Sequence, residues 1–317
     1  MDFALLRDAF WSLTFDGIAL GAIYGLISLG YTLVYGVLRL INFAHSEVFM
    51  IGTFASIATT TTVMGFSVEM DPLTGGKMVL TMVVTLVLSM LASGLTAVLV
   101  EIIAYRRLRT RGATKLATLI SAIGVSISLV EIFRLITKSL PREYPRVMDK
   151  SFLFSFWGAD VRNDKVIIIL AAGIMMIVLD LFINRTRFGK GIRAVSMDEN
   201  TAALMGVNIN RIITITFLMG GLMAGAAGYF YMLTYENTSF KVGFVLGLSA
   251  FTAAVLGGIG NIRGALVGAF ALGLIENYSG ALFGVAWKSV ITFTLLVLVL
   301  LFKPTGILGE SIQQARV

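Results

Sequence analysis

The sequence contains no cysteine, one histidine and four prolines among its 317 residues, and only 14% of its residues are charged. The absence of cysteine excludes disulfides and thiol chemistry. With a single histidine as well, the chain has too few nitrogen and sulfur ligands for a zinc site. Soluble domains carry about a quarter charged residues. Because this chain falls well below that fraction and is 57% hydrophobic, we expect an all-α polytopic membrane protein.

The motifs of several common enzyme classes are also missing. The sequence has no G-x-x-x-x-G-K-[ST] phosphate loop, no G-x-S-x-G nucleophile turn and no H-E-x-x-H metal pair. We therefore predict that the chain is not an enzyme and holds no cofactor of its own. If ATP drives the protein, a partner subunit must bind the ATP and its Mg²⁺. The first ten residues lack a cationic region ahead of an apolar run, so no cleaved signal peptide is expected.

Nine apolar segments are candidate membrane spans, and several contain glycine freely, as membrane helices do. They lie at 11–38, 42–65, 77–104, 116–138, 165–184, 212–235, 244–259, 264–283 and 286–303. We expect about eight or nine transmembrane helices in a single domain over residues 1–317, with one or two of them broken or re-entrant. Residues 34–52 and 254–273 share a pattern: each begins with an apolar run, is interrupted by Gly and Asn together with one Arg, and continues with a second apolar run. This similarity predicts two related halves.

The positive charge is concentrated in two loops. Five cations and no acid lie between Tyr105 and Lys115, and five more lie between Arg185 and Arg211. Basic clusters beside membrane spans mark the cytoplasmic side. We therefore interpret the positive charge as a sign of how the chain is oriented in the membrane, and not as a sign of nucleic-acid binding. Parity then places the N-terminus and the 139–164 loop outside, and Lys303 and the C-terminus inside. The aromatic run in the outer loop suggests a hairpin at the membrane surface.

A polar stretch separates the first two apolar segments. It contains Asn42, His45, Ser46 and Glu47, with Arg39 just before them. Two residues apart, His45 and Glu47 do not share a helix face, whereas Asn42 and His45, three apart, would. One interpretation is a solvated cytoplasmic turn. The other, which we favour, is a broken helix whose polar groups line or gate a translocation path, because a charge inside a span costs about 2.5–3.5 kcal/mol.

Asp180 and Glu276 are among the further acidic residues within the apolar segments. Asp180 lies one turn before a basic loop, within reach of Asn184 or Arg185. Glu276 has no cation nearby in the sequence. We therefore regard Glu276 as a second candidate for the path, and an interhelical hydrogen bond is the alternative.

The 184–211 loop has the signals of a short capped helix. Ser196 and Glu199 have the spacing of a capping box, and Gly206 is a natural C-terminal stop. We expect a helix from about Met197 to Met205 with a small apolar-biased face that includes Leu204. Such a helix suits either the lipid interface or the groove of a cytoplasmic partner.

Three segments resemble the LivH-type permeases of branched-chain amino-acid ABC transporters. They are "NFAHSEVFMIGTFA" (42–55), "TRFGKGIRAVSMDENTAALMGVNINR" (186–211) and "GGIGNIRGALVGAFALGLIE" (257–276). The resemblance implies a permease subunit in the bacterial inner membrane. Its partners would be a second permease subunit, either related or identical, two ABC ATPases that bind ATP and Mg²⁺, and an extracytoplasmic solute-binding protein.

The resemblance also assigns roles within the chain. Loop 184–211 would receive the motion of the ATPases through Arg193, Ser196, Met197, Asp198, Glu199, Thr201, Leu204, Met205 and Gly206. Branched-chain amino acids would be the solutes. Three alternatives stay open: a related permease for urea or short amides, a proton-coupled secondary amino-acid transporter that uses Glu47, Glu276 and His45, and a passive channel.

Overall fold

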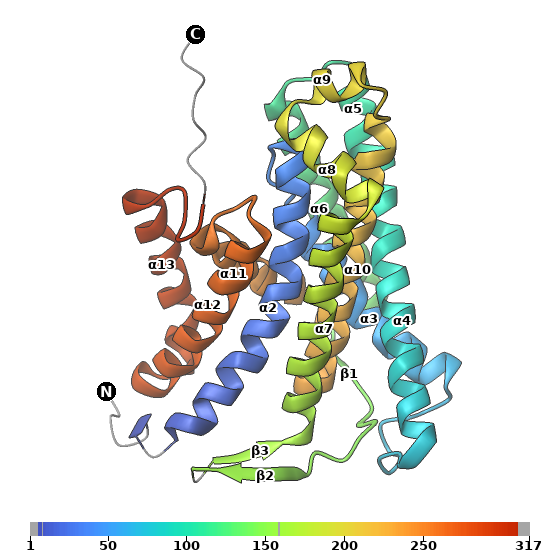
Figure 1. Ribbon diagram of the computed structural model, residues 1–317. Coiled ribbons are helices and arrows are strands. Elements are labelled where there is room, and N and C mark those ends of the chain that lie inside the picture. The colour runs from blue at the N-terminus through green and yellow to red at the C-terminus, as the bar shows by residue number, and fades with distance from the viewer. Residues whose placement is uncertain (1–5, 8, 158, 310–317) are drawn as a thin grey trace.

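The computed structural model describes residues 6–7, 9–157 and 159–309, and it consists mostly of helices (Figure 1). The helices are α2 (Phe10–Leu38), α3 (His45–Ala58), the π-helix η1 (Thr59–Val63), α4 (Gly75–Val100), the π-helix η2 (Glu101–Arg106), α5 (Arg107–Thr110), α6 (Lys115–Thr137), α7 (Asn163–Arg185), α8 (Arg187–Met197), α9 (Glu199–Leu204), α10 (Ile209–Tyr235), α11 (Val242–Gly257), α12 (Ile262–Phe283), the 3₁₀-helix η3 (Val285–Trp287) and α13 (Lys288–Phe302). The strands are β1 (Arg142–Glu143), β2 (Phe152–Phe156), β3 (Ala159–Arg162) and β4 (Asn237–Thr238).

Each of the nine predicted spans contains a helix of nearly the expected length. Among the described residues, seven helical stretches are long and apolar enough to cross a membrane, and α11 is a shorter apolar helix of 16 residues. The helix α3 is also short, with 14 residues, and η1 extends it. The prediction of an all-α polytopic membrane protein is therefore confirmed, with α3 and α11 as the two short segments.

The two basic loops lie at one end of the molecule, which we call the basic end. It contains α5, α8 and α9, and the β2–β3 hairpin lies at the opposite end beside the start of α2 (Figure 1). We call the latter the hairpin end. This arrangement agrees with the parity of the predicted spans. The predicted sides of the two termini are not tested, because residues 1–5 and 310–317 lie outside the described residues.

The predicted outer loop forms a hairpin. Strand β2 pairs antiparallel with β3, and the other two strands, β1 and β4, form a second short sheet. Aromatic side chains attach the hairpin to the start of α2, because the ring centroids of Phe156 and Trp11 lie 5.2 Å apart. The exposed aromatic residues Phe152, Phe154 and Trp157 suit a membrane interface, where aromatic rings are enriched.

The fold contains two related sets of helices. Leu38 ends α2, and the next residue, Arg39, is left-handed with φ 52°; Tyr235 ends α10, and Glu236 follows with φ 55°. The short helix α3 then begins six residues after Arg39, and α11 begins six residues after Glu236. Since α2 runs toward the basic end and α10 runs away from it (Figure 1), the two halves are inverted relative to each other.

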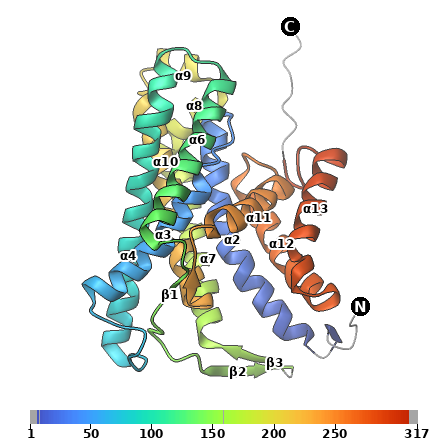
Figure 2. The same cartoon turned by 180° about the vertical axis from the view of Figure 1, so that it is seen from behind.

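Packing between the sets follows the same correspondence. Helix α2 lies along α12, and α10 lies along α4. The helices α3 and α11 pack together near the centre, between α6 and α13 (Figure 2). The predicted repeat therefore exists with a different register from the one expected. The break at 39–44 corresponds to 236–241, and not to the glycine-rich turn at 257–261.

Glycine permits the close approach of the helices in both halves. A Cβ at Gly273 of α12 would lie 2.7 Å from the Cα of Gly21 in α2, and a Cβ at Gly225 of α10 would lie 2.7 Å from the Cα of Met90 in α4. Small residues allow backbones to meet in this way, and membrane helices use them where hydrophobic driving force is absent. The helix pairs that carry the repeat are therefore specified by small side chains.

Candidate translocation site and coupling segment

The polar stretch between α2 and α3 is buried in the bundle. Asn42, His45, Ser46 and Glu47 are each at most 6% exposed. The interpretation as a solvated turn is therefore wrong. The structure instead contains the alternative that we predicted, a break of the chain followed by the start of a helix, because α3 begins at His45.

His45 lies in a space left by two glycines. A Cβ on Gly30 of α2 would overlap the imidazole ring, and a Cβ on Gly220 of α10 would lie 3.6 Å from its Cε1 atom. The ring packs edge-on against Tyr31, with 4.9 Å between centroids. Its buried Nε2 atom has no hydrogen-bond partner among the described residues. The histidine is thus held by shape at the junction of α2, α3 and α10.

Glu47 lies where the N-termini of α3 and α11 meet. Its Oε1 atom accepts hydrogen bonds from the hydroxyls of Ser46 and Ser126, each at 3.2 Å, while its buried Oε2 has no partner among the described residues. A Cβ on Gly243 of α11 would lie 2.5 Å from Oε2. Helix N-termini are positive, so the ends of the two short helices stabilise an anionic group at this point.

Asn42 does not share a helix with His45, contrary to the expected spacing argument. It precedes α3, and its Oδ1 accepts a hydrogen bond of 2.7 Å from the hydroxyl of Tyr105 in η2. The side chain therefore connects the break in the chain to the basic loop that follows α4.

Glu276 makes the interhelical hydrogen bonds that were the alternative to a role in the path. Its carboxylate accepts from the hydroxyls of Tyr24 at 2.8 Å, Ser249 at 3.2 Å and Thr292 at 2.5 Å. These three donors belong to α2, α11 and α13. The sequence did not point to them, because a hydroxyl inside an apolar run has no distinctive local signal. No hydrogen bond connects Glu276 with Glu47 among the described residues.

The predicted helix at 197–205 is wrong in its start. Helix α8 continues to Met197, and α9 begins anew at Glu199. Asp198 caps α9 by accepting from the backbone amides of Asn200 at 2.9 Å and Thr201 at 3.2 Å. The hydroxyl of Ser196 instead donates to the carbonyl of Arg193, because Ser196 still lies within α8. The aspartate thus replaces the predicted capping box.

The cap of α9 has a clear electrostatic signature. The hydroxyl of Thr201, followed by its backbone amide, lowers the pKa of the exposed Asp198 carboxyl below its ordinary value. At the other end, Gly206 has φ +84°, which confirms it as the glycine that stops the helix.

The predicted coupling segment, which we define as α8, α9 and the following Met205 and call the coupling segment below, presents apolar side chains to its surroundings. Met197, Leu204 and Met205 are 86%, 88% and 80% exposed. On the opposite side Ile192 and Val195 are buried and attach α8 to α7 and α10. Exposed apolar side chains can contribute to interaction surfaces, and these three residues all belong to the loop at the basic end.

Two polar contacts hold the coupling segment to the bundle. Arg39 donates a hydrogen bond of 2.6 Å to the carbonyl of Ser196, and Arg193 donates one of 2.7 Å to Asn184. The expected contact of Asp180 with Asn184 or Arg185 is not among the hydrogen bonds and ion pairs of the described residues. Asp180 lies 3.8 Å from Arg263 of α12 instead, a residue that is far away in the sequence.

A buried carboxylate near the basic end was missed by sequence reasoning. Glu101 is 0% exposed in its side chain and pairs with Arg106 at 2.6 Å and Arg109 at 3.2 Å. The hydroxyl of Thr214 in α10 bonds to the same carboxylate at 3.2 Å. The run of arginines after Glu101 was the available signal. This cluster joins η2 and α5 to α10.

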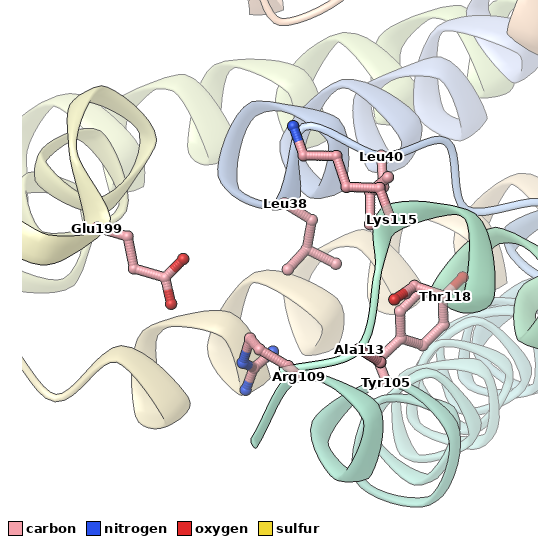
Figure 3. Close-up of a pocket in the computed structure, with 8 residues that line it drawn as sticks. All are labelled: Leu38, Leu40, Tyr105, Arg109, Ala113, Lys115, Thr118 and Glu199. Atoms are coloured by element: carbon pink, nitrogen blue, oxygen red, sulfur yellow. The ribbon is translucent and has the colours of Figure 1, made fainter. Parts of the chain in front are cut away.

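A cavity of about 160 Å³, lined by both charged and apolar side chains, lies beside this cluster. Figure 3 shows Glu199 on one side of the cavity and Lys115, Thr118 and Tyr105 on the other. The remaining lining residues are Leu38, Leu40, Arg109 and Ala113. The cavity therefore lies between the coupling segment and the start of the chain break.

Comparison with known proteins places the chain in a family. The model of the branched-chain amino acid transport system permease component matches residues 13–300. The permease protein BraD of the high-affinity branched-chain amino acid transport system of Pseudomonas aeruginosa is 38% identical over 93% of this chain and 94% of its own length. The LivH permease protein of Escherichia coli K12, from a system with the same description, is 37% identical over the same shares.

A more distant relative supports the same assignment. The probable branched-chain amino acid transport permease protein LivH of Methanocaldococcus jannaschii is 24% identical over 96% of this chain and 95% of its own length. No solved structure matches the chain. The chain belongs to the family of permease components of branched-chain amino acid transport systems.

Proposed function

We propose that this chain is the transmembrane permease subunit of an ATP-driven importer of branched-chain amino acids. The observation that carries the proposal is the match to permeases of these systems across nearly the whole chain. The inverted pair of broken segments at the centre of the bundle supports it, because transporters built from inverted repeats bind their solutes near such breaks.

The translocation path runs past the junction of α3, α6 and α11. Glu47 is the polar group of this junction with an unused buried oxygen atom, and Asn42, His45 and Ser46 form its surroundings. Glu276 has a structural role beside the path, because its three hydrogen bonds connect α2, α11 and α13 to the helix α12 that carries it. The path is otherwise apolar, which suits an aliphatic amino acid delivered by a separate, selective binding protein.

The basic end faces the cytoplasm in this proposal, as positive loops do, so the described part of the C-terminal segment, including Lys303, is also cytoplasmic. The protein lies in the cytoplasmic membrane of a prokaryote. Two ATPase subunits, which bind ATP and Mg²⁺, dock on the coupling segment of this chain and of a second permease subunit. A solute-binding protein docks at the hairpin end.

The contact of Arg39 with Ser196 provides the route from the ATPases to the path. Arg39 is the residue at which α2 ends, and Ser196 lies at the end of α8. A displacement of α8 therefore acts on the link that carries Asn42 and on the start of α3. The left-handed φ of 52° at Arg39 marks the point at which the chain turns.

The proposal is tested by co-expressing the chain with the ATPase genes that neighbour its own gene and purifying the complex in detergent. We expect the wild type to retain the ATPases and the double variant Met197→Glu, Leu204→Glu to lose them. Because both side chains are almost fully exposed, the variant should keep its fold and its elution volume. As a matched control, Val68→Glu and Met70→Glu change residues in the loop between η1 and α4, each 49% exposed, and should retain the ATPases.

Retention of the ATPases by the double variant would contradict the assignment of the coupling segment. Uptake by the chain alone, driven by a proton gradient, would contradict the importer as a whole and favour a secondary transporter.

A further inference from the structure

The cavity at the basic end is large enough to hold a small organic molecule. Its volume of about 160 Å³ is roughly ten times the 10–15 Å³ that one water requires. Three separate parts of the chain line it: the end of α2 with its link, the segment from η2 to α6, and α9. A ligand bound there would contact all three parts at once.

One wall of the cavity is suited to an anionic group. The Nη1 atom of Arg109 is buried and has no hydrogen-bond partner among the described residues, while its Nη2 is held by Glu101 and Asn210. Lys115 is the first residue of the 23-residue helix α6, whose N-terminal amides add positive potential. Charge-assisted hydrogen bonds from such groups are the strong contacts by which proteins bind carboxylates.

Another part of the lining is suited to a cation, and a third part is apolar. Glu199 carries its carboxylate on the first residue of α9 and faces the cavity (Figure 3). Leu38, Leu40 and Ala113 supply the apolar part of the lining. Cationic, anionic and aliphatic surfaces around one cavity match the carboxylate, ammonium and side chain of an aliphatic α-amino acid.

We propose that this cavity is a cytoplasmic binding site for an aliphatic α-amino acid, and that its occupancy inhibits transport. The inference rests on the proposed function, because it makes the transported solute the ligand. Its carboxylate contacts Arg109 and Lys115, its ammonium contacts Glu199, and its side chain contacts the leucines. A bound amino acid attaches α9 to α5 and α6 and so opposes the motion of the coupling segment. Solute that accumulates in the cytoplasm thereby slows its own import.

The experiment uses the complete complex in lipid nanodiscs, where both faces are accessible. ATP hydrolysis is measured with saturating leucine-loaded binding protein while free leucine is raised to millimolar concentration. We expect the hydrolysis rate to fall by at least about half. Leucinamide, which lacks the carboxylate, and 4-methylpentanoate, which lacks the ammonium, should have little effect at the same concentration.

Two variants locate the effect in the cavity. Lys115→Gln removes a charge from the anion wall, and Ala113→Phe fills the space, so both should lose the inhibition by free leucine. Arg107→Gln is the matched control, because Arg107 is an exposed cation of the same loop that does not line the cavity, and it should be inhibited like the wild type. Saturation-transfer NMR with leucine on complexes without binding protein reports binding independently of hydrolysis. We expect the signal to be lost in the two cavity variants alone.

Each outcome has a distinct meaning. Hydrolysis that the loaded binding protein stimulates but free leucine does not inhibit would overturn this inference and leave the proposed function standing. Equal inhibition of the wild type and both cavity variants would also overturn it. Failure of the binding protein to stimulate hydrolysis at all would contradict the proposed function, and the NMR measurement would then still decide whether the cavity binds leucine.

Discussion

Position 30 must be glycine because His45 occupies the space that a side chain would need. A Cβ there would overlap the imidazole ring, and both residues are buried. A local sequence signal for this pairing does not exist, since the two residues lie on different helices. The histidine, the only one in the chain, is thus a packing element of the α2–α3 junction as well as a candidate for the path.

We predict that Gly30→Ala destabilises the protein by about 1–3 kcal/mol, as overpacking of a close-packed interior does. The measurement is the thermal unfolding of the detergent-solubilised protein. Gly36→Ala is the matched control, because Gly36 lies in the same helix with no atom near its potential Cβ. It should be neutral or stabilise by about 0.5–1 kcal/mol. Equal effects of the two substitutions would refute the packing argument.

We predict that Glu47→Gln lowers uptake at least about tenfold while the subunits still assemble. Glutamine has nearly the same shape but no charge, and hydrogen bonds to charged groups are worth about 1.5–3 kcal/mol. Uptake in proteoliposomes and co-purification of the ATPases are the two readouts. Glu69→Gln serves as control, because Glu69 is exposed in the loop between η1 and α4 and lies outside the polar stretch. Normal uptake by Glu47→Gln would remove Glu47 from the path.

At the scale of elements, the coupling segment consists of two helices with different tasks. Helix α8 packs against the bundle through its buried Ile192 and Val195. Helix α9 has only six residues, so its stability depends on its caps. The sequence correctly indicated the C-terminal end of a short helix at Gly206. It did not reveal that α8 would continue through Ser196, because this depends on the burial of the apolar face of α8 against α7 and α10.

We predict that Asp198→Ala destabilises α9 by about 1 kcal/mol, the usual effect of removing an N-cap. Amide exchange at residues 199–204 should accelerate about fivefold, as measured by hydrogen–deuterium exchange of the purified protein. Ser196→Ala should leave these amides unchanged, because Ser196 bonds to Arg193 and not to α9. The reverse ranking of the two variants would reinstate the capping box.

The cap also has a predictable pH dependence. The pKa of Asp198 is lowered in the folded protein below its ordinary value of 3.8. Its contribution is therefore present above pH 3.8 and is lost as the pH falls through the lowered pKa. Exchange at 199–204 should stay constant, after correction for intrinsic rates, from neutral pH down to about pH 4.

At the scale of the whole molecule, two inverted sets of helices surround the central pair α3 and α11. The left-handed residues Arg39 and Glu236 stand at corresponding points, and the short helices after them meet at Glu47 and Gly243. This arrangement places two helix N-termini at the centre of an apolar bundle. It explains how a buried carboxylate is tolerated there, and it makes the central pair the natural place for the path.

We predict that Gly225→Ala and Gly273→Ala destabilise the protein similarly, by about 1–3 kcal/mol each. They occupy corresponding helix contacts, and each new Cβ would lie 2.7 Å from a backbone Cα of the neighbouring helix. Thermal unfolding is again the measurement. Gly124→Ala and Gly173→Ala, on helix faces with nothing within 4 Å, are the controls. A large effect at only one of the two contact positions would show that the halves are not equivalent in packing.

The sequence by itself determined the class of the protein, the positions of its helices and its family. These properties depend on hydropathy, charge and motifs within short stretches, so the nine predicted spans agree with the helices to within a few residues. Only the tertiary structure decided which polar residues are buried, since Tyr24 and Glu276 or Ser126 and Glu47 are separated by 252 and 79 residues along the chain. The register of the repeat, the true cap at Asp198 and the cavity beside Glu199 were decided in the same way. Each depends on contacts between helices, and a local sequence pattern does not specify which helices will be neighbours.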